Sequence, residues 1–307
     1  MSIEASIIIP TYNRKNILKR SLGHLFKQTY PAAKYEIIVV DDGSVDGTTE
    51  MIKTLRPPCS LRYFRQDNKG PAAARNLGIK NAKGRIIIFL DDDIFATPRL
   101  IEEYISYHDR FSNVFVSGYT LLSSELIKSS LFLRYAKKRH ERSPQSSTNL
   151  VFSKFITSNI SVKRKNFLDI GLFDETLGKY GWEDIEWGYR AHKRGLKLKF
   201  NKNAIAYHYK NPTFEESCRL HRLMGKSAVS FHEKHPDPKI GLLLGIHPLL
   251  VFAKSILYNK PLVKLCQKII PHIQYRKLFP ILCFCYSVVL EYYYFIGIKE
   301  GLRKRMH

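Results

Sequence analysis

The stretch Arg85–Asp93 reads RIIIFLDDD, an apolar run that ends in three consecutive aspartates. A second run, Tyr35–Asp42, reads YEIIVVDD. Short runs rich in β-branched residues are typical of strands buried on both faces, as in a parallel sheet covered by helices. The carboxylates then lie at the strand ends, where open α/β sheets bind ligands. Because like charges repel each other there, the pattern predicts a divalent metal that carries a phosphorylated ligand.

Strand-like and helix-like segments alternate over the first ~120 residues, as in βαβ units. Residues that often begin helices precede or open three of the helical segments: Asp46, Pro71 and Pro98. The predicted strands lie near residues 5–9, 35–40, 61–65, 85–90 and 113–118, and the predicted helices near 15–28, 46–55, 71–82 and 98–110. The fold class is therefore α/β, a mostly parallel, Rossmann-like sheet flanked by helices.

The charge of the chain is unusual for its size. The sequence has 307 residues, 44% of them hydrophobic, and a formal net charge of +23. Such an excess of lysine and arginine predicts an anionic partner, which is nucleic acid, an acidic membrane surface or a phosphate-bearing substrate. Eleven of the basic residues follow residue 238, against two acidic ones, in the most apolar part of the chain.

Two apolar stretches in that part, Ile240–Tyr258 and Leu278–Ile298, approach the ~20 residues needed to span a bilayer. Each contains a proline and ionisable groups that make spanning costly. Docking on an anionic membrane surface fits better than spanning or a soluble helical cap. We therefore expect a catalytic domain over residues 1–235, divided near 120 into donor and acceptor parts, and a helical membrane-docking region over 236–307.

The cysteines and the N-terminus bear on the compartment. The five cysteines are odd in number and form no C-x-x-C pair, which argues against a disulfide framework or a zinc site. The chain enters a predicted strand almost at once, without the pattern of a secretion signal. We expect a cytoplasmic protein, peripheral on the inner face of the cell membrane.

Four motifs occur in a fixed order. They are IIIPTYNR (7–14), VVDDGSVDGT (39–48), GPAAARNLG (70–78) and FLDDD (89–93). In this order and spacing the chain resembles the family 2 glycosyltransferases, which have the GT-A fold, over roughly residues 3–235. The resemblance implies an inverting, metal-dependent transfer of a sugar from a nucleotide diphosphate sugar, most simply a UDP-sugar.

The resemblance also implies donor-binding residues. Tyr12 would stack on the uracil, Asp42 would accept from the base or ribose, and Arg75 would meet the base or the diphosphate. The full set of expected donor-binding residues is Pro10, Thr11, Tyr12, Arg14, Asp42, Arg75, Asp91 and Asp92.

The aspartate run resembles the D-x-D motif of the family. Asp93 would be the main metal ligand and Asp91 would contact the ribose and the metal, with His208 as a further ligand. Carboxylate oxygens suit Mn²⁺ or Mg²⁺, which neutralise charge on the departing nucleoside diphosphate. A histidine that ends a strand is otherwise commonly structural.

A second constellation, GKYGWEDIEWGYR over 178–190, resembles the acceptor-side E-D motif of the family and the W-G-x-E-D segment of galactosyltransferase-like chains. Asp184 would be the catalytic base, with Glu183 beside it. Alternatively, the pair only complements the helix dipole. Trp182, Gly181 and Asn159 would line the acceptor site, whereas Trp187 would lie in the core.

Membrane docking suggests a saccharide acceptor, or one linked to polyprenyl diphosphate, in the synthesis of a surface polysaccharide or glycolipid. Two other classes are weighed. A metal-dependent nucleotidyltransferase would also use clustered aspartates, but usually with two metals. A nucleic-acid-binding protein would explain the charge, yet the acidic strand ends would repel phosphates and no binding motif is present, so we expect no nucleic-acid partner.

Overall fold

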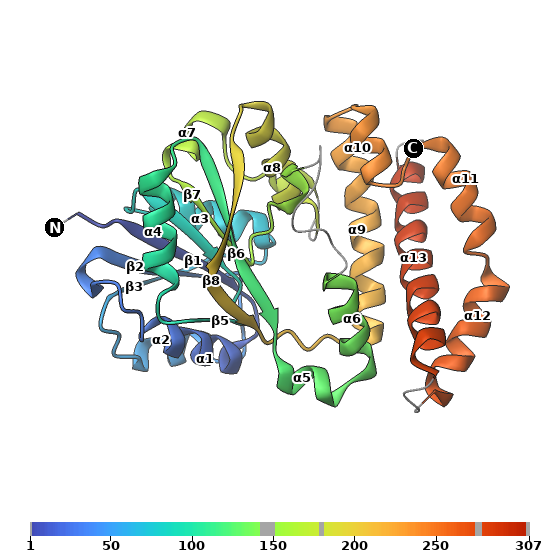
Figure 1. Ribbon diagram of the computed structural model, residues 1–307, viewed down its shortest axis with the longest axis horizontal. Coiled ribbons are helices and arrows are strands. Elements are labelled where there is room, and N and C mark those ends of the chain that lie inside the picture. Colours follow the sequence, from blue (N-terminus) through green and yellow to red (C-terminus); the bar gives the residue numbers. More distant parts are fainter. Residues whose placement is uncertain (1, 142–150, 178–180, 274–277, 305–307) are drawn as a thin grey trace. The chain divides into compact units, whose positions relative to one another are not determined.

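The computed structural model describes residues 2–141, 151–177, 181–273 and 278–304 (Figure 1). The chain forms two compact units. The first, the sheet unit, comprises Met1–Ser123, Ser146–Glu175 and Glu183–Lys210. The second, the helical unit, comprises Ser124–Gln145, Thr176–Trp182 and Asn211–His307.

The described strands of the sheet unit form one eight-stranded sheet in the order β3-β2-β1-β4-β7-β6-β8-β5. The strands are β1 (Ala5–Thr11), β2 (Tyr35–Asp41), β3 (Ser60–Arg65), β4 (Ile86–Leu90), β5 (Ile94–Ala96), β6 (Val114–Leu122), β7 (Asn159–Lys163) and β8 (Lys197–His208). Strands β1 to β4 pair in parallel, and β7 then runs antiparallel to both β4 and β6. The predicted α/β class is confirmed, with a mixed sheet.

Helices cover both faces of this sheet, as its doubly buried strands require. They are α1 (Lys15–Leu25), α2 (Thr48–Thr54), α3 (Pro71–Asn81), α4 (Leu100–Arg110), α7 (Lys165–Ile170) and α8 (Glu183–Lys193). Alternate residues of each central strand divide between two cores. Ile7 and Ile9 pack with α1, α2 and α4, whereas Ile8 packs with α3, α7 and α8. Trp187 of α8 is fully buried, as predicted.

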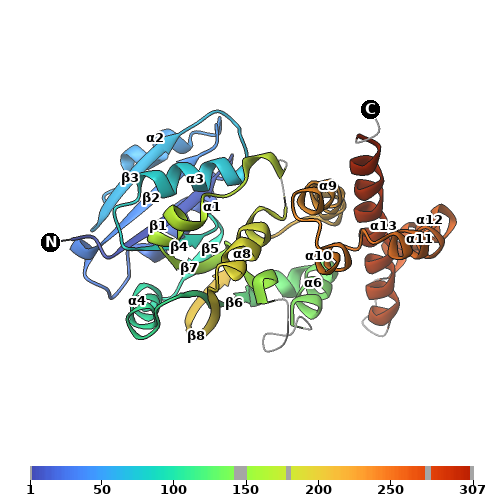
Figure 2. The ribbon, with the colours of Figure 1, turned by 90° about the horizontal axis from the view of Figure 1, so that it is seen from above.

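The helical unit contains α5 (Ser124–Ser129), α6 (Leu131–Glu141), α9 (Phe214–Lys234), α10 (Pro238–Leu243), α11 (Pro248–Leu257), α12 (Lys260–Ile269) and α13 (Phe279–Lys304). Helices α9 and α13 lie side by side in both ribbon views (Figures 1 and 2). Their backbones meet at glycines, since a Cβ added to Gly225 would lie 2.1 Å from the carbonyl oxygen of Tyr294. A Cβ on Gly297 would likewise lie 2.0 Å from the carbonyl oxygen of Arg222. Any larger residue at either glycine would force the two helices apart.

By length and apolar composition, two helical stretches qualify as membrane spans, Pro238–Leu257 and Phe279–Arg303. The first is not one continuous helix, because α10 and α11 are separated by Gly245 in the left-handed region (φ 65°). A helix as short as α11 rises only ~15 Å, half the thickness of a bilayer core. Half of the apolar window of α13 is already buried within the protein.

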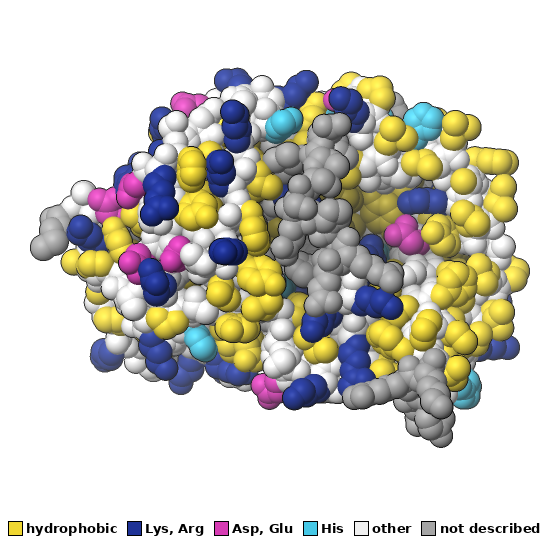
Figure 3. Space-filling model, in the orientation of Figure 1, with side chains coloured by type: hydrophobic (Ala, Val, Ile, Leu, Met, Phe, Trp, Pro, Cys, Tyr) yellow, Lys and Arg dark blue, Asp and Glu magenta, His cyan; other side chains and the backbone are white. Residues whose placement is uncertain are grey.

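Hydrophobic side chains gather over α11 and α12, as Figure 3 shows. The most exposed of them are Leu249 at 73% and Phe252 at 67%, both on α11. On α12, Lys260, Lys264 and Lys268 are exposed. The described surface of these helices is thus apolar and basic at once.

Candidate functional site

The predicted site residues of the N-terminal motifs follow three neighbouring strands of the sheet. Tyr12 follows β1, Asp42 follows β2, and Asp91 to Asp93 follow β4. Because β1 lies between β2 and β4 and all three run in parallel, these ends meet at one edge. Asn13 is in the left-handed region, and its side chain accepts a hydrogen bond from the backbone N–H of Val45 at 2.8 Å. This bond links the loop after β1 to the loop after β2.

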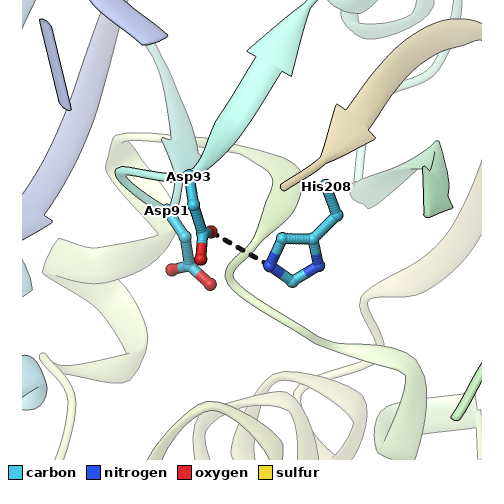
Figure 4. A group of neighbouring side chains, drawn as sticks. All are labelled: Asp91, Asp93 and His208. Atoms are coloured by element: carbon cyan, nitrogen blue, oxygen red, sulfur yellow. Dashed lines mark ion pairs between the residues drawn. The ribbon is translucent and has the colours of Figure 1, made fainter. Parts of the chain in front are cut away.

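Asp91, Asp93 and His208 form a cluster in which one ligand atom from each lies within 4.8 Å of the others. Figure 4 shows the two carboxylates on the loop after β4, with the imidazole at the end of β8. Nε2 of His208 lies 3.0 Å from Oδ1 of Asp93. Two carboxylates and an imidazole in this arrangement are a suitable ligand set for Mn²⁺ or a related divalent ion.

Two ligand atoms of this cluster bear on whether a metal fits. Oδ1 of Asp93 and Nε2 of His208 are buried, and among the described residues the only polar group that each one faces is the other, at 3.0 Å. Burying polar atoms with too few partners costs free energy. An ion between Asp93 and His208 would supply the missing partner. Burial alone would raise the pKa of Asp93, but His208 and Arg14 outweigh it and hold that pKa below its ordinary value. The carboxylate is therefore ionised, as a metal ligand must be.

Asp92, the middle aspartate, is held by the protein. It accepts a bond from Thr11 at 2.8 Å and pairs with Arg14 at 2.9 Å. Burial raises its pKa to about 7, which the charge of Arg14 only partly offsets. Arg14 also donates to Asp93 at 2.7 Å, so it bridges two of the three aspartates. In this structure Thr11 and Arg14, both expected at the donor, organise the aspartate loop.

Asp42 and Tyr12 differ in their freedom to bind a ligand. The carboxylate of Asp42 accepts bonds from the side chain of Gln66 at 2.7 Å and from the backbone N–H groups of Lys69 and Gly70 at 2.9 Å. These three bonds hold the carboxylate of Asp42 at the sheet edge, and only its unused lone pairs remain for a base. Tyr12 is 47% exposed, and its ring is free to stack on one.

Arg75 joins the two constellations within the sheet unit. Its guanidinium donates to Glu183 at 3.0 Å and to Asp91 at 3.3 Å. Burial alone would lower the pKa of Arg75, but the surrounding carboxylates outweigh it and raise the pKa above the ordinary value. The arginine thus stays charged between the aspartate loop and the start of α8.

Asp184 lies next to this ion pair, at the first turn of α8. Its carboxylate accepts from the backbone N–H groups of Ile185 at 2.8 Å and Thr157 at 3.3 Å. Its pKa is raised to about 7, first by burial and then by the charge of Glu183, with Arg75 opposing the shift. A carboxylate with a pKa near neutrality is poised to exchange a proton.

The three predicted acceptor residues lie in different surroundings. Asn159 is 3% exposed, and its amide accepts from Tyr104 at 2.7 Å and donates to the carbonyl of Ala204, so contact with a sugar would require these bonds to open. In the helical unit, Trp182 is in the left-handed region (φ 71°), and its indole donates to the carbonyl of Met224 at 3.0 Å. Gly181 precedes it with φ 93°. Residues 178–180 of the motif lie outside the described residues.

Several supports of the site have no signal in the sequence. Gln66 donates to Asp42, and Tyr63 donates to the buried Asp41 at 2.6 Å. The ion pair of Arg75 with Glu183 joins residues that are 108 positions apart. No short motif signals a contact over that separation.

The fold is that of the GT-A glycosyltransferases. Residues 6–159 match the family profile described as glycosyl transferase family 2. The chain belongs to this family. It is 30% identical over 262 residues to an uncharacterized glycosyltransferase, YfnE, of Bacillus subtilis (strain 168), which covers 69% of this chain and 66% of that protein. It is also 30% identical over 238 residues to glycosyltransferase AglE of Haloferax volcanii, covering 73% and 72% respectively.

Among solved structures, the mannosyltransferase PcManGT of Pyrobaculum calidifontis, in complex with GDP-Man and Mn²⁺, is similar with a TM-score of 0.64 at 16% identity. The match covers 99% of this chain and 88% of that one. At this identity the likeness concerns the fold. The chain spans 66% of the length of YfnE and 50–54% of two further curated relatives.

Proposed function

We propose that the protein is an inverting glycosyltransferase that moves a sugar from a nucleotide diphosphate sugar to a saccharide or lipid-linked acceptor. The observation that carries this proposal is the cluster of Asp91, Asp93 and His208 at the edge of a family 2 fold, in which the buried Oδ1 of Asp93 and Nε2 of His208 face only each other among the described residues. The rival class of metal-dependent nucleotidyltransferases does not require the second carboxylate pair, Glu183 and Asp184.

The donor is a UDP-sugar in this proposal. Support comes from the exposed ring of Tyr12 and from Asp42, which together suit a flat base with an N–H donor. Proteins of similar fold have been solved with GDP-Man and with UDP-GlcNAc. These structures support a nucleotide sugar as the donor and do not distinguish uracil from guanine. Pro10, Thr11, Arg14, Arg75, Asp91 and Asp92 complete the proposed donor site.

Asp93, Asp91 and His208 would hold Mn²⁺ or Mg²⁺. When bound, the ion supplies positive charge that offsets the negative charge of the departing nucleoside diphosphate. Arg14 keeps Asp93 ionised and oriented, while Arg75 holds Asp91 from the other side. These contacts preorganise the ligands before any ion arrives.

Asp184 is the proposed base. It removes the proton of the acceptor hydroxyl as that oxygen bonds to the anomeric carbon, while the bond from that carbon to the donor phosphate oxygen breaks. Inversion follows because the oxygen enters opposite the leaving group. Glu183 and Arg75 tune this carboxylate, and Trp182, Gly181 and Asn159 form the proposed acceptor side, including the galactosyltransferase-like segment.

The remaining parts of the proposal concern location. We assign catalysis to residues 1–235 and docking on an anionic membrane surface to 236–307, on the inner face of the cell membrane. The support is the combination of exposed apolar residues on α11 with exposed lysines on α12. The chondroitin synthase of Escherichia coli, 28% identical over 239 residues, fits a role in polysaccharide synthesis. No nucleic-acid partner is proposed.

A panel of nucleotide sugars tests the function. Each sugar is supplied with Mn²⁺ or Mg²⁺, and the released nucleoside diphosphate, the product stereochemistry and the thermal stabilisation of the protein are measured. Release of diphosphate with an inverted product from one sugar is the expected result. Release of pyrophosphate from a nucleoside triphosphate instead would reassign the chain to the nucleotidyltransferases.

A further inference from the structure

The helical unit contains a cavity of about 460 Å³ that the proposed reaction does not use. Its walls come from α9, α12, α13 and the short 3-10 turn Ile270–His272. A cavity of this volume is in the range that binds small molecules and single lipid chains. The residues that carry its apolar wall are Phe214, Cys218, Ile270, Pro271 and Tyr293.

The apolar wall is rigid on one side. The ring of Phe214 packs against Tyr286 with centroids 4.8 Å apart and against Phe132 at 5.4 Å. Cys218 is buried behind it, and burial raises the pKa of this thiol to about 12, so the residue contributes apolar surface rather than a reactive thiolate. Because these side chains hold one another, an apolar chain that enters the cavity meets a preformed surface.

Charged groups border the same cavity. Arg219 is exposed and makes no hydrogen bond or ion pair with any residue that the structure describes. Arg222 pairs with Glu300, and Lys226 shares that carboxylate at 2.7 Å, so two cations face one anion. Glu215 is the acidic member of the lining. When Glu300 and Lys226 are included, the side chains at the cavity border carry a net positive charge, and Arg219 is the cation without a partner among the described residues.

We propose that this cavity binds a lipid that bears a phosphate group, with its apolar chain against Phe214 and Tyr293 and its phosphate on Arg219. An arginine fork matches phosphate oxygens, and the unpaired guanidinium at the border of an apolar cavity is the arrangement that such an amphipathic ligand requires. Two sources share this chemistry, an isoprenoid phosphate of the kind that carries saccharides and a phospholipid of the bilayer. The inference concerns binding alone and does not depend on the proposed transfer reaction.

The test measures binding to the full-length protein by titration calorimetry with soluble probes below their micelle concentration. Decyl phosphate should bind at least tenfold more tightly than decanol or inorganic phosphate, since it alone engages both parts of the site. Arg219→Gln should weaken decyl phosphate about tenfold and leave decanol unchanged. Lys53→Gln, which removes an exposed charge of α2 in the sheet unit, is the control and should change neither.

Two further measurements identify which class of phosphate-bearing lipid binds and test the cavity with a second variant. Tighter binding of geranyl phosphate than of dihexanoyl phosphatidylglycerol assigns the cavity to isoprenoid phosphates, and the reverse order assigns it to phospholipids. Cys218→Phe, which fills the cavity, should abolish binding of decyl phosphate, with thermal melting used to check that the variant folds. Equal binding of decyl phosphate by the protein and by Arg219→Gln, or equal binding of decanol and decyl phosphate, would overturn the proposal.

Discussion

Arg75 and Glu183 form a buried ion pair, with Nη1 of the arginine 3.0 Å from Oε1 of the glutamate, although 108 residues separate them in the chain. The same guanidinium reaches Asp91 of the aspartate loop at 3.3 Å. The proposed metal ligands and the proposed base are therefore connected through one cation. A substitution that removes the charge of Arg75 should therefore affect both the proposed metal site and the proposed base.

Replacing Arg75 with methionine should destabilise the protein by about 3 kcal/mol, since removing one member of a buried pair leaves the other charge uncompensated. The variant should also raise the pKa of Asp184 further, because Arg75 opposes the upward shift. Chemical denaturation measures the first effect and the pH dependence of kcat the second. The double variant with Glu183→Gln should recover part of the lost stability, and no recovery would contradict the pairing.

Asp93→Asn should weaken Mn²⁺ binding in the presence of nucleotide by about 10- to 100-fold and abolish transfer, because it removes a proposed ligand charge. EDTA should inactivate the unaltered protein, and added Mn²⁺ should restore it. Calorimetric titration with the metal provides the measurement. Asp169→Asn, at an exposed position on α7, is the control that should bind metal normally. Full activity in EDTA would refute the metal assignment.

Asp184→Asn should lower kcat by roughly 100-fold and leave the affinity for the nucleotide sugar nearly unchanged, as expected for a group that acts only on the acceptor proton. In the unaltered protein, kcat should fall as the pH drops below about 7, where Asp184 becomes protonated. A variant with near-normal turnover would move the role of base to another residue.

The same substitution should change stability with a defined sign. The pKa of Asp184 is raised from 3.8 to about 7 in the folded protein, so its ionisation opposes folding fully above pH 7 and not at all below pH 4. Asp184→Asn should thus stabilise the protein at pH 8 by on the order of 2 kcal/mol and by much less at pH 4.5. Melting curves at the two pH values provide the comparison, and a gain that is independent of pH would contradict the shifted pKa.

The full-length protein should sediment with vesicles that contain acidic lipid, and less so at high salt, because exposed charges are screened over ~10 Å at 0.1 M. Deleting the region after residue 240 is a poor test, since α13 packs on α9. We expect Phe252→Ser with Ile256→Ser, both exposed on α11, to reduce binding at all salt concentrations. Lys264→Gln with Lys268→Gln should reduce only the part that depends on salt.

Carbonate extraction separates docking from spanning. Release at alkaline pH is expected for a protein held at the surface. Resistance to extraction together with indifference to lipid charge would favour a spanning α13 instead.

Gly225→Ala should destabilise the helical unit by about 1–3 kcal/mol, since its Cβ would meet backbone atoms of α13 rather than a movable side chain. Gly23→Ala on α1 is the matched control, because a Cβ there has no neighbour within 4 Å among the described residues. The control should be neutral or stabilising, as alanine is the better helix former. Thermal melting of both variants measures the difference, and equal melting temperatures would contradict the close approach of α9 and α13.

Local sequence patterns predicted five of the eight described strands, β1 to β4 and β6, together with helices α1 to α4 and the edge where the aspartates gather. Runs such as residues 86–90 are short and rich in β-branched residues, which favours strands buried on both faces, and the parallel order then brings their ends together. The family followed from four local motifs. These are properties of short stretches, so local patterns suffice to predict them.

The pairing of the polar groups, in contrast, is visible only in the folded protein. Thr11 and Arg14 hold the aspartate loop, Asn159 is bonded within the core, and Arg75 joins Asp91 to Glu183. The burial of α13 against α9 likewise comes from packing. The physical reason is that hydrogen bonds and desolvation depend on partners brought together from distant parts of the chain, and no local pattern specifies them.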